Sequence, residues 1–228
     1  MNSSRKIAIL VGVLFLIGTV AGVLSVVFTG PILGAPDYLS KVAASKNQLI
    51  IGALLVLLMG FALAMVPVMM FPIFKKHNEV LALGSVVFRG VLEAVTYIAI
   101  VISWLLLLTL SQEYVKAGAP DASYFQSLGT LLLEAVNWIN QILAIVFSLG
   151  ALMIYYLFYQ SKLIPRWLSA WGLIGAILYL ATPLLGMFGS GLEILMAPLA
   201  LQEIVLAIWL IAKGFNQSAI AYESAKTE

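Results

Sequence analysis

The most regular feature of the sequence is a succession of long apolar stretches separated by short polar connections. Six stretches are predicted to be membrane-spanning helices: residues 7–28, 49–74, 80–110, 124–159, 167–188 and 192–212. Each has at least the roughly 20 residues that a helix needs to cross a bilayer. The connections are rich in Gly, Pro, Asn and Asp, which end helices and form turns. The pattern therefore predicts an all-α fold, a polytopic transmembrane bundle of six spanning helices.

The composition agrees with a membrane protein and leaves little room for anything else. Of the 228 residues, 63% are hydrophobic and only 10% are charged, whereas a soluble domain has about 25% charged residues. We therefore expect a single transmembrane domain over residues 1–228, ending in a short polar tail at 213–228. The first apolar stretch follows a basic flank, as in a signal peptide, but no clear cleavage motif ends it. We expect it to remain as the first helix.

The positive charges of the connections are distributed unevenly across the predicted membrane. One side carries Arg5, Lys6, Lys75, Lys76, Lys162, Arg166, Lys213 and Lys226, and the other side carries Lys41, Lys46 and Lys116. Since loops rich in Lys and Arg stay in the cytoplasm, we expect both termini to be cytoplasmic and the protein to lie in the cytoplasmic (inner) membrane. The net charge of +2 comes from these loops. It indicates contact with membrane lipids and no binding of nucleic acid.

Two of the predicted helices carry a regular stripe of polar residues. In helix 80–110 the stripe consists of Ser85, Arg89, Glu93, Thr96 and Ser103. In helix 124–159 it consists of Ser127, Thr130, Glu134, Asn137, Gln141, Ser148 and Tyr155. Steps of three, four or seven residues place each set on one helical face. Because polar groups that face lipid are costly, we expect both stripes to face the bundle interior or each other.

The last predicted span adds two polar residues, Gln202 and Glu203, deep within the membrane. At 1.5 Å per residue, Glu93 and Glu203 should lie near the midplane, with Arg89 about 6 Å closer to the cytoplasm. Glu134 should lie in the outer half. An ionised side chain at the bilayer centre costs about 2.5–3.5 kcal/mol on insertion scales. Arg89 and Glu93 must therefore relieve one another, or be relieved by another partner or by water. If the cluster only locks helix packing, we expect Arg89 to pair with Glu93 or with Glu203.

Two interpretations of these intramembrane polar groups remain open at this point. Either they only lock helix packing, or they line a cavity that binds or transports a small polar or amphipathic ligand, or relays protons. In the second, leading interpretation, Arg89 holds an anionic group or a carboxylate, and Glu93 or Glu203 titrates. The candidate residues are Arg89, Glu93, Glu134, Asn137, Gln141, Gln202 and Glu203. The alternatives are a structural or regulatory membrane partner without a ligand and a lipid-acting enzyme with carboxylates as acid and base.

Several kinds of chemistry find no support in the sequence. The chain has no cysteine and a single histidine, His77, in a predicted loop, which excludes thiolate metal sites and bis-histidine haem ligation. No nucleophile has a histidine base within a span, and no glycine-rich phosphate loop is present. Met65 and Met69 lie one helical turn apart, but without nearby Cys or His they are interpreted as apolar packing. We expect no metal and no cofactor, and the enzyme alternative ranks last.

Four segments of the sequence are similar to a known family. They are "PILGAPDYL", "LLTLSQEYVKAGAPDASYFQSLG", "YYLFYQSKLIPRWLSAWGLIGA" and "APLALQEIVLAIWLIAKGFN", and they resemble the uncharacterised prokaryotic membrane family called domain of unknown function 4386. The resemblance extends over essentially the whole chain and implies a small bacterial multi-helix inner-membrane protein. It implies no activity. Arg89, Glu134 and Glu203 fall within recognisable family segments, but the resemblance assigns them no role. The oligomeric state stays open.

Overall fold

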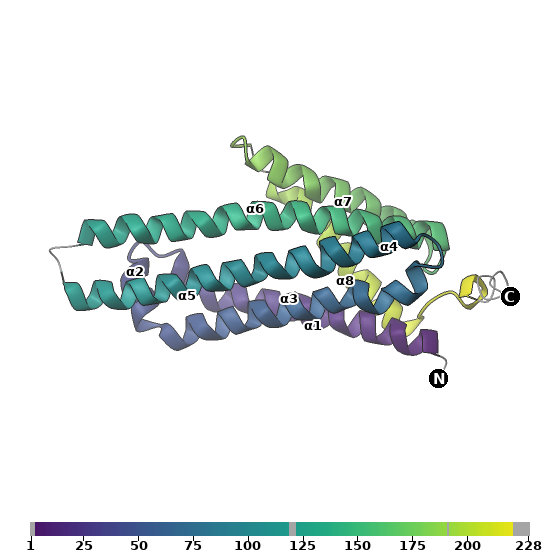
Figure 1. The fold of residues 1–228 in the computed structure, drawn as a ribbon, viewed down its shortest axis with the longest axis horizontal. Helices are drawn as coiled ribbons and strands as arrows, with labels where there is room; N and C mark the ends of the chain where they lie inside the picture. The colour runs from purple at the N-terminus through teal and green to yellow at the C-terminus, as the bar shows by residue number, and fades with distance from the viewer. Residues whose placement is uncertain (1–2, 119–121, 191, 221–228) are drawn as a thin grey trace.

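In the computed structural model the chain forms a bundle of long helices (Figure 1), described for residues 3–118, 122–190 and 192–220. The elements are α1 (Ser3–Leu33), α2 (Tyr38–Ala44), α3 (Lys46–Phe74), α4 (Glu79–Ser85), the π-helical segment η1 (Val86–Leu92), α5 (Glu93–Ala117), α6 (Ala122–Ser161), α7 (Arg166–Gly186), the 3-10 turn η3 (Glu193–Met196) and α8 (Ala197–Ala212). These described parts of the chain contain no strand. The predicted all-α fold is confirmed.

Six helical segments of the described chain are long and apolar enough to cross a membrane. They are Ser3–Leu33, Lys46–Phe74, Glu79–Ala117, Ser123–Ser161, Arg166–Gly186 and Glu193–Ala212. Each corresponds to one of the six stretches predicted from the sequence. The chain is therefore a multi-pass integral membrane protein. Part of the predicted polar tail, residues 221–228, lies outside the described residues.

The structure differs from the prediction at some helix ends. The short helix α2 lies in a segment that was expected to be an irregular connection. The last span, Glu193–Ala212, begins with the 3-10 turn η3, which places Pro198 in the first turn of α8. A proline is favourable there, since the first N–H groups of a helix have no partner within it.

The two ends of the bundle differ in what they carry. At one end, which we call the terminal end, Arg5 at the start of α1 lies on the last turn of α8. At the same end, Phe74 of α3 packs edge-on against Phe158 of α6, with 5.0 Å between the ring centroids. The opposite end, the distal end, carries α2 (Figure 1). α1 thus begins, and α8 ends, on the same side of the bundle.

The helices that pack together differ in length. In the packing of the long helices, α8 lies against α1 and α7, α6 lies against α5 and α7, and α1 lies against α3. However, α6 has 40 residues, whereas α7 has 21 and α8 has 16. The last residue of α7, Gly186, lies beside Gln141, and a methyl group there would come within 3.2 Å of the Gln141 amide. Figure 1 shows α6 continuing well beyond α7 toward the distal end.

The largest cluster of buried apolar side chains lies in the terminal half of the bundle and is shared by α1, α3, α6, α7 and α8. Phe15, Met70, Phe158, Leu168 and Leu206 belong to this cluster and are at most 2% exposed. Arg89 is as deeply buried as these apolar residues, at 1% exposure. A buried cation of this size requires specific partners, and these partners form the candidate site.

Candidate functional site

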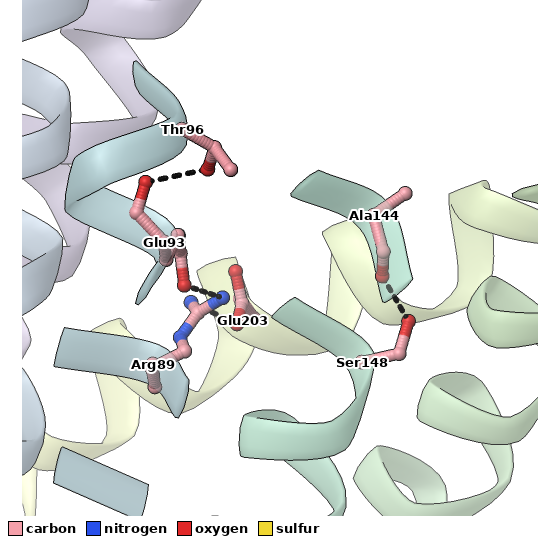
Figure 2. A network of polar contacts seen from close by, with 6 residues as sticks. All are labelled: Arg89, Glu93, Thr96, Ala144, Ser148 and Glu203. Atoms are coloured by element: carbon pink, nitrogen blue, oxygen red, sulfur yellow. Dashed lines mark hydrogen bonds and ion pairs between the residues drawn. The ribbon is translucent and has the colours of Figure 1, made fainter. Parts of the chain in front are cut away.

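The centre of the candidate site is an ion-paired cluster of three charged residues. Nη2 of Arg89 lies 2.7 Å from Oε1 of Glu203, and Nη1 lies 3.3 Å from Oε2 of Glu93. Figure 2 shows the guanidinium group between the two carboxylates. Arg89 and Glu93 come from one continuous helical span, and Glu203 comes from α8. Both pairings that the sequence offered for Arg89 are therefore present.

The backbone around Arg89 is irregular. Residues Val86–Leu92 form π-helical turns between α4 and α5, and π turns inside α-helices are frequent at functional sites. Opposite them, α6 approaches very closely, because a methyl group on Gly150 would lie 2.8 Å from the backbone nitrogen of Arg89. A glycine at position 150 is thus required for this contact. The π turns and the contact with Gly150 together determine the position of the Arg89 backbone.

Aromatic rings cover the Arg89 guanidinium. Its central carbon lies 4.0 Å from the ring centroid of Phe147 and 6.0 Å from that of Phe15, both within the range of cation–π interactions. Phe147 in turn packs against Tyr179, with 4.7 Å between the ring centroids. The rings shield the guanidinium, while Nη2 donates a hydrogen bond to Glu203 and Nη1, within the described residues, forms only an ion pair with Glu93. The contacts of the Arg89 guanidinium are therefore with other residues of the protein.

The polar groups of the cluster are only partly satisfied. Glu93 is 1% exposed, and neither of its carboxylate oxygens makes a well-formed hydrogen bond within the described residues; the same holds for the Tyr155 hydroxyl. The hydroxyls of Tyr97 and Tyr155 lie near Glu93 and Glu203, respectively. With one guanidinium and two carboxylates, the ionised cluster carries a formal charge of −1. It has capacity for a further positive charge or hydrogen-bond donor.

A cavity of about 390 Å³ lies on the distal side of the cluster. Its polar lining residues are Thr19, Tyr97, Asn140, Tyr179 and Glu203, and the remainder of its wall consists of Gly, Ala, Leu, Met and Phe. The Glu203 side chain is 15% exposed, whereas Arg89 and Glu93 are each 1% exposed. Among the described residues, Glu203 is the one charged residue in the cavity wall. Glu203 is thus the residue of the cluster that faces the cavity.

The exposed residues of the cavity wall indicate where the cavity opens. Asn140 of α6 and Ala200 of α8 line it and are exposed, so the cavity opens between these two helices. On the terminal side, the buried Phe15 and Arg89 lie behind the wall. A molecule would therefore enter between α6 and α8 and reach Glu203 at the inner end.

The structure brings together three of the seven residues singled out in the sequence, namely Arg89, Glu93 and Glu203. Gln202 is fully buried, but it faces α7, where its Nε2 donates to the Leu168 carbonyl oxygen at 3.1 Å. Gln202 therefore fastens α8 to α7 and lies outside the cavity wall. Gln141 lies beside the end of α7 and does not contact the cluster.

The expectation that the whole polar stripe of α6 faces the interior is wrong for its distal half. Ser148 and Tyr155 are buried, but Glu134 and Asn137 are exposed. The reason is that α7 ends beside Gln141 and therefore does not extend over Glu134 and Asn137. Exposed polar residues at the distal end of a 40-residue helix suit its projection beyond the bilayer.

Sequence analysis also missed several residues of the cavity. Asn140 lines the wall although it lies one position off the regular stripe. Tyr97, Phe147 and Tyr179 surround the cluster, but aromatic residues in an apolar helix are common and gave no signal of their own. Their positions depend on which helices are neighbours, and the spacing along one helix does not contain that information.

Comparison with known proteins identifies a family. A family model described as domain of unknown function (DUF4386) matches residues 10–214, which extend from within α1 to just beyond α8 and include the whole cluster. No curated protein matches the chain, and no solved structure matches it. The resemblance noted in the sequence is confirmed, and the chain belongs to the family of domain of unknown function 4386.

Proposed function

We propose that this protein binds a small amphipathic molecule with an amine or ammonium head group in the cavity that ends at Glu203. One observation carries the proposal: the charged residue in the cavity wall is a carboxylate of a cluster with one carboxylate in excess over its single cation. A cationic head group would balance that charge. The apolar wall would hold the rest of the molecule.

The geometry favours a cation over an anion. The Arg89 guanidinium lies behind Glu203, between Phe147 and two carboxylates, and it is 1% exposed. An anionic ligand would therefore meet Glu203 first and be repelled. A cation would meet the carboxylate and the neighbouring rings of Tyr97 and Tyr179, which attract cations through their π faces. Of the two roles considered for Arg89, holding a carboxylate fits these contacts.

The size and lining of the cavity support a small amphipathic ligand. Its volume of about 390 Å³ lies in the range of about 300–1,000 Å³ typical of small-molecule pockets, which combine apolar walls with a few polar groups. Met59 and Met196 are in the wall, and flexible methionine side chains adapt to ligands of different shape. A sugar or nucleotide would leave most of its polar groups unpaired against this wall.

We further propose that the protein lies in the cytoplasmic membrane of a bacterial cell with the terminal end inside. Support comes from the basic residues that belong to the terminal end: Arg5, Lys6, Lys75, Lys76, Lys162, Arg166 and Lys213. The distal end carries fewer, namely Lys41, Lys46 and Lys116, and the richer side is cytoplasmic as a rule. In this orientation the cavity opens in the outer part of the membrane domain.

Transport of the same ligand is a second candidate function, favoured by two adjacent irregularities. Pro67 lies inside α3, and its ring is 3.6 Å from the position of a Cβ on Gly90 in the π segment. Prolines and π turns are the places where helices bend. Bending there would separate Arg89 from Glu203 and open the cavity toward the terminal end. Uptake of a labelled alkylamine into proteoliposomes tests this function.

Native mass spectrometry of the protein released from mild detergent tests the proposed binding. The comparison is between the wild type, Glu203→Gln and the control Glu134→Gln, which makes the same chemical change at an exposed position of α6. We expect a bound small molecule on the wild type and on the control, and none on Glu203→Gln. An empty wild type, or equal occupancy in all three, would favour a structural or regulatory role without ligand.

A further inference from the structure

A second cavity, of about 430 Å³, lies at the terminal end and shares no lining residue with the Glu203 cavity. It forms between the loop that follows α6 and the segment that follows α8. Two hydrogen bonds hold these segments together: the Asn216 N–H donates to the Leu163 carbonyl at 2.9 Å, and Asn216 Nδ2 donates to the Lys162 carbonyl at 3.4 Å. The pocket is therefore a defined feature of the fold. We call it the terminal pocket.

The terminal pocket is strongly basic. Lys162, Arg166 and Lys213 line it, and all three are exposed. None of the three forms an ion pair with a carboxylate of the described residues, and no acidic residue lines the pocket. Three uncompensated cations around one cavity favour an anion with several oxygen atoms, such as a phosphate group.

One of the cations is held in place by a local contact. The Arg166 guanidinium lies over the ring of Tyr159, 5.4 Å from its centroid. Lys162 has a backbone φ of 57°, in the left-handed region that few residues other than glycine adopt. Arg166 is thus positioned at the pocket before an anion arrives.

Aromatic and apolar residues adjoin the basic pocket. Trp209 lines it and packs edge-on against Trp167, with 6.4 Å between the ring centroids. Tryptophan is enriched where the membrane meets water. Farther along α7 and α8, the exposed residues Ile174, Ile177, Leu201 and Ile208 are all apolar. Cations at head-group level followed by an apolar helix surface match the two parts of a phospholipid.

We propose that the terminal pocket binds the phosphate group of an anionic phospholipid. Lys162, Arg166 and Lys213 contact the phosphate oxygens, and the acyl chains lie along the outward faces of α7 and α8. Free phosphate has the same anionic chemistry, but the adjoining tryptophans and apolar faces favour the lipid. The proposal is independent of the Glu203 cavity. A bound lipid would tie the α6–α7 loop to the end of α8.

The test uses the full chain, stripped of lipid in mild detergent and offered equal amounts of phosphatidylglycerol and phosphatidylcholine with identical acyl chains. Native mass spectrometry counts the lipids that remain bound. We expect a several-fold preference for phosphatidylglycerol in the wild type and a ratio near one in Lys162→Gln/Arg166→Gln/Lys213→Gln. The control Lys6→Gln/Lys75→Gln/Lys76→Gln removes the same charge at the same end outside the pocket, and it should keep the preference.

Three results would overturn the proposal. They are no preference in the wild type, an equal loss of preference in the pocket variant and the control, or displacement of the lipid by inorganic phosphate at equal concentration, which would identify a site for the free anion. Lys162→Gly gives a check that does not depend on the folding of the triple variant. Glycine adopts the φ of 57° without strain, so this variant should keep its thermal stability while its preference for phosphatidylglycerol falls. An unchanged preference in Lys162→Gly would count against the site.

Discussion

Arg89 and Glu203 lie 114 positions apart in the sequence and are joined by a 2.7 Å contact between Nη2 and Oε1. The contact links the π segment η1 to α8, although α8 packs mainly on α1 and α7. The ion pair therefore bridges the interior of the bundle and separates the Glu203 cavity from the buried core. It stabilises the fold and also positions the carboxylate that faces the cavity.

Removing the cation should destabilise the protein strongly. In Arg89→Met, Glu93 and Glu203 lose their shared partner while remaining buried, which costs about 3–5 kcal/mol for a broken buried ion pair. Combining Arg89→Met with Glu93→Gln and Glu203→Gln should recover part of this loss, because no unpaired charge is left. Thermal unfolding in detergent, followed by tryptophan fluorescence, measures both variants. If Arg89→Met without the other two substitutions unfolds at the wild-type temperature, the ion pairs of Arg89 do not contribute to stability.

Gly150→Ala should disturb the site through the backbone. The added methyl group would lie 2.8 Å from the nitrogen of Arg89, so α6 and η1 must move apart, at a cost of about 1–3 kcal/mol for overpacking. Gly30→Ala is the matched control, since nothing lies within 4 Å of its added methyl group and Gly30 is also inside a helix. Unfolding temperatures should fall for Gly150→Ala only. Equal changes in both would point to helix propensity as the cause.

Arg5 should contribute to stability by capping α8. Its guanidinium donates to the carbonyl oxygens of Leu210, Ile211 and Ala212 at 3.2, 2.7 and 3.2 Å, groups that have no partner within the helix. Arg5→Ala should cost about 1.5–3 kcal/mol, the value of hydrogen bonds made by charged groups. The neighbouring exposed Lys6 provides the control Lys6→Ala, which should unfold at the wild-type temperature. A similar loss in both variants would argue against the cap.

The orientation can be tested with introduced cysteines, because the chain has none of its own. Lys76→Cys lies at the terminal end and Lys116→Cys at the distal end, and both positions are exposed. A maleimide that does not cross membranes should label Lys116→Cys on intact cells and Lys76→Cys only after permeabilisation. The opposite pattern would place the terminal end outside.

The sequence predicted the six spans because their apolar character is a property of each segment alone. It also offered Glu93 and Glu203 as partners of Arg89 in the packing interpretation, since a buried guanidinium needs a carboxylate at a similar depth. The structure places both carboxylates beside Arg89. The sequence left another partner or water open as well, because it does not show that the helices carrying these residues are neighbours.

What the sequence did not predict depends on contacts between helices. Glu134 was expected inside the bundle, but the short α7 ends before reaching it. The π segment around Arg89 lies against Gly150 of another helix. Phe147 covers the guanidinium only because α6 lies opposite η1. Such features require the arrangement of neighbours, which no single-helix pattern specifies.

The most direct test of the central claim is the binding of two probes of equal chain length and opposite head charge, octylammonium and octanoate, measured by isothermal titration calorimetry in detergent. The account predicts that octylammonium binds the wild type and that it binds Glu203→Gln at least tenfold more weakly. It should also bind more weakly to Ala200→Trp, because this variant places a large ring at the exposed edge of the cavity. Octanoate should not bind. Equal binding of the two probes, or unchanged octylammonium binding in both variants, would contradict the assignment of Glu203 as the cation-binding residue of this cavity.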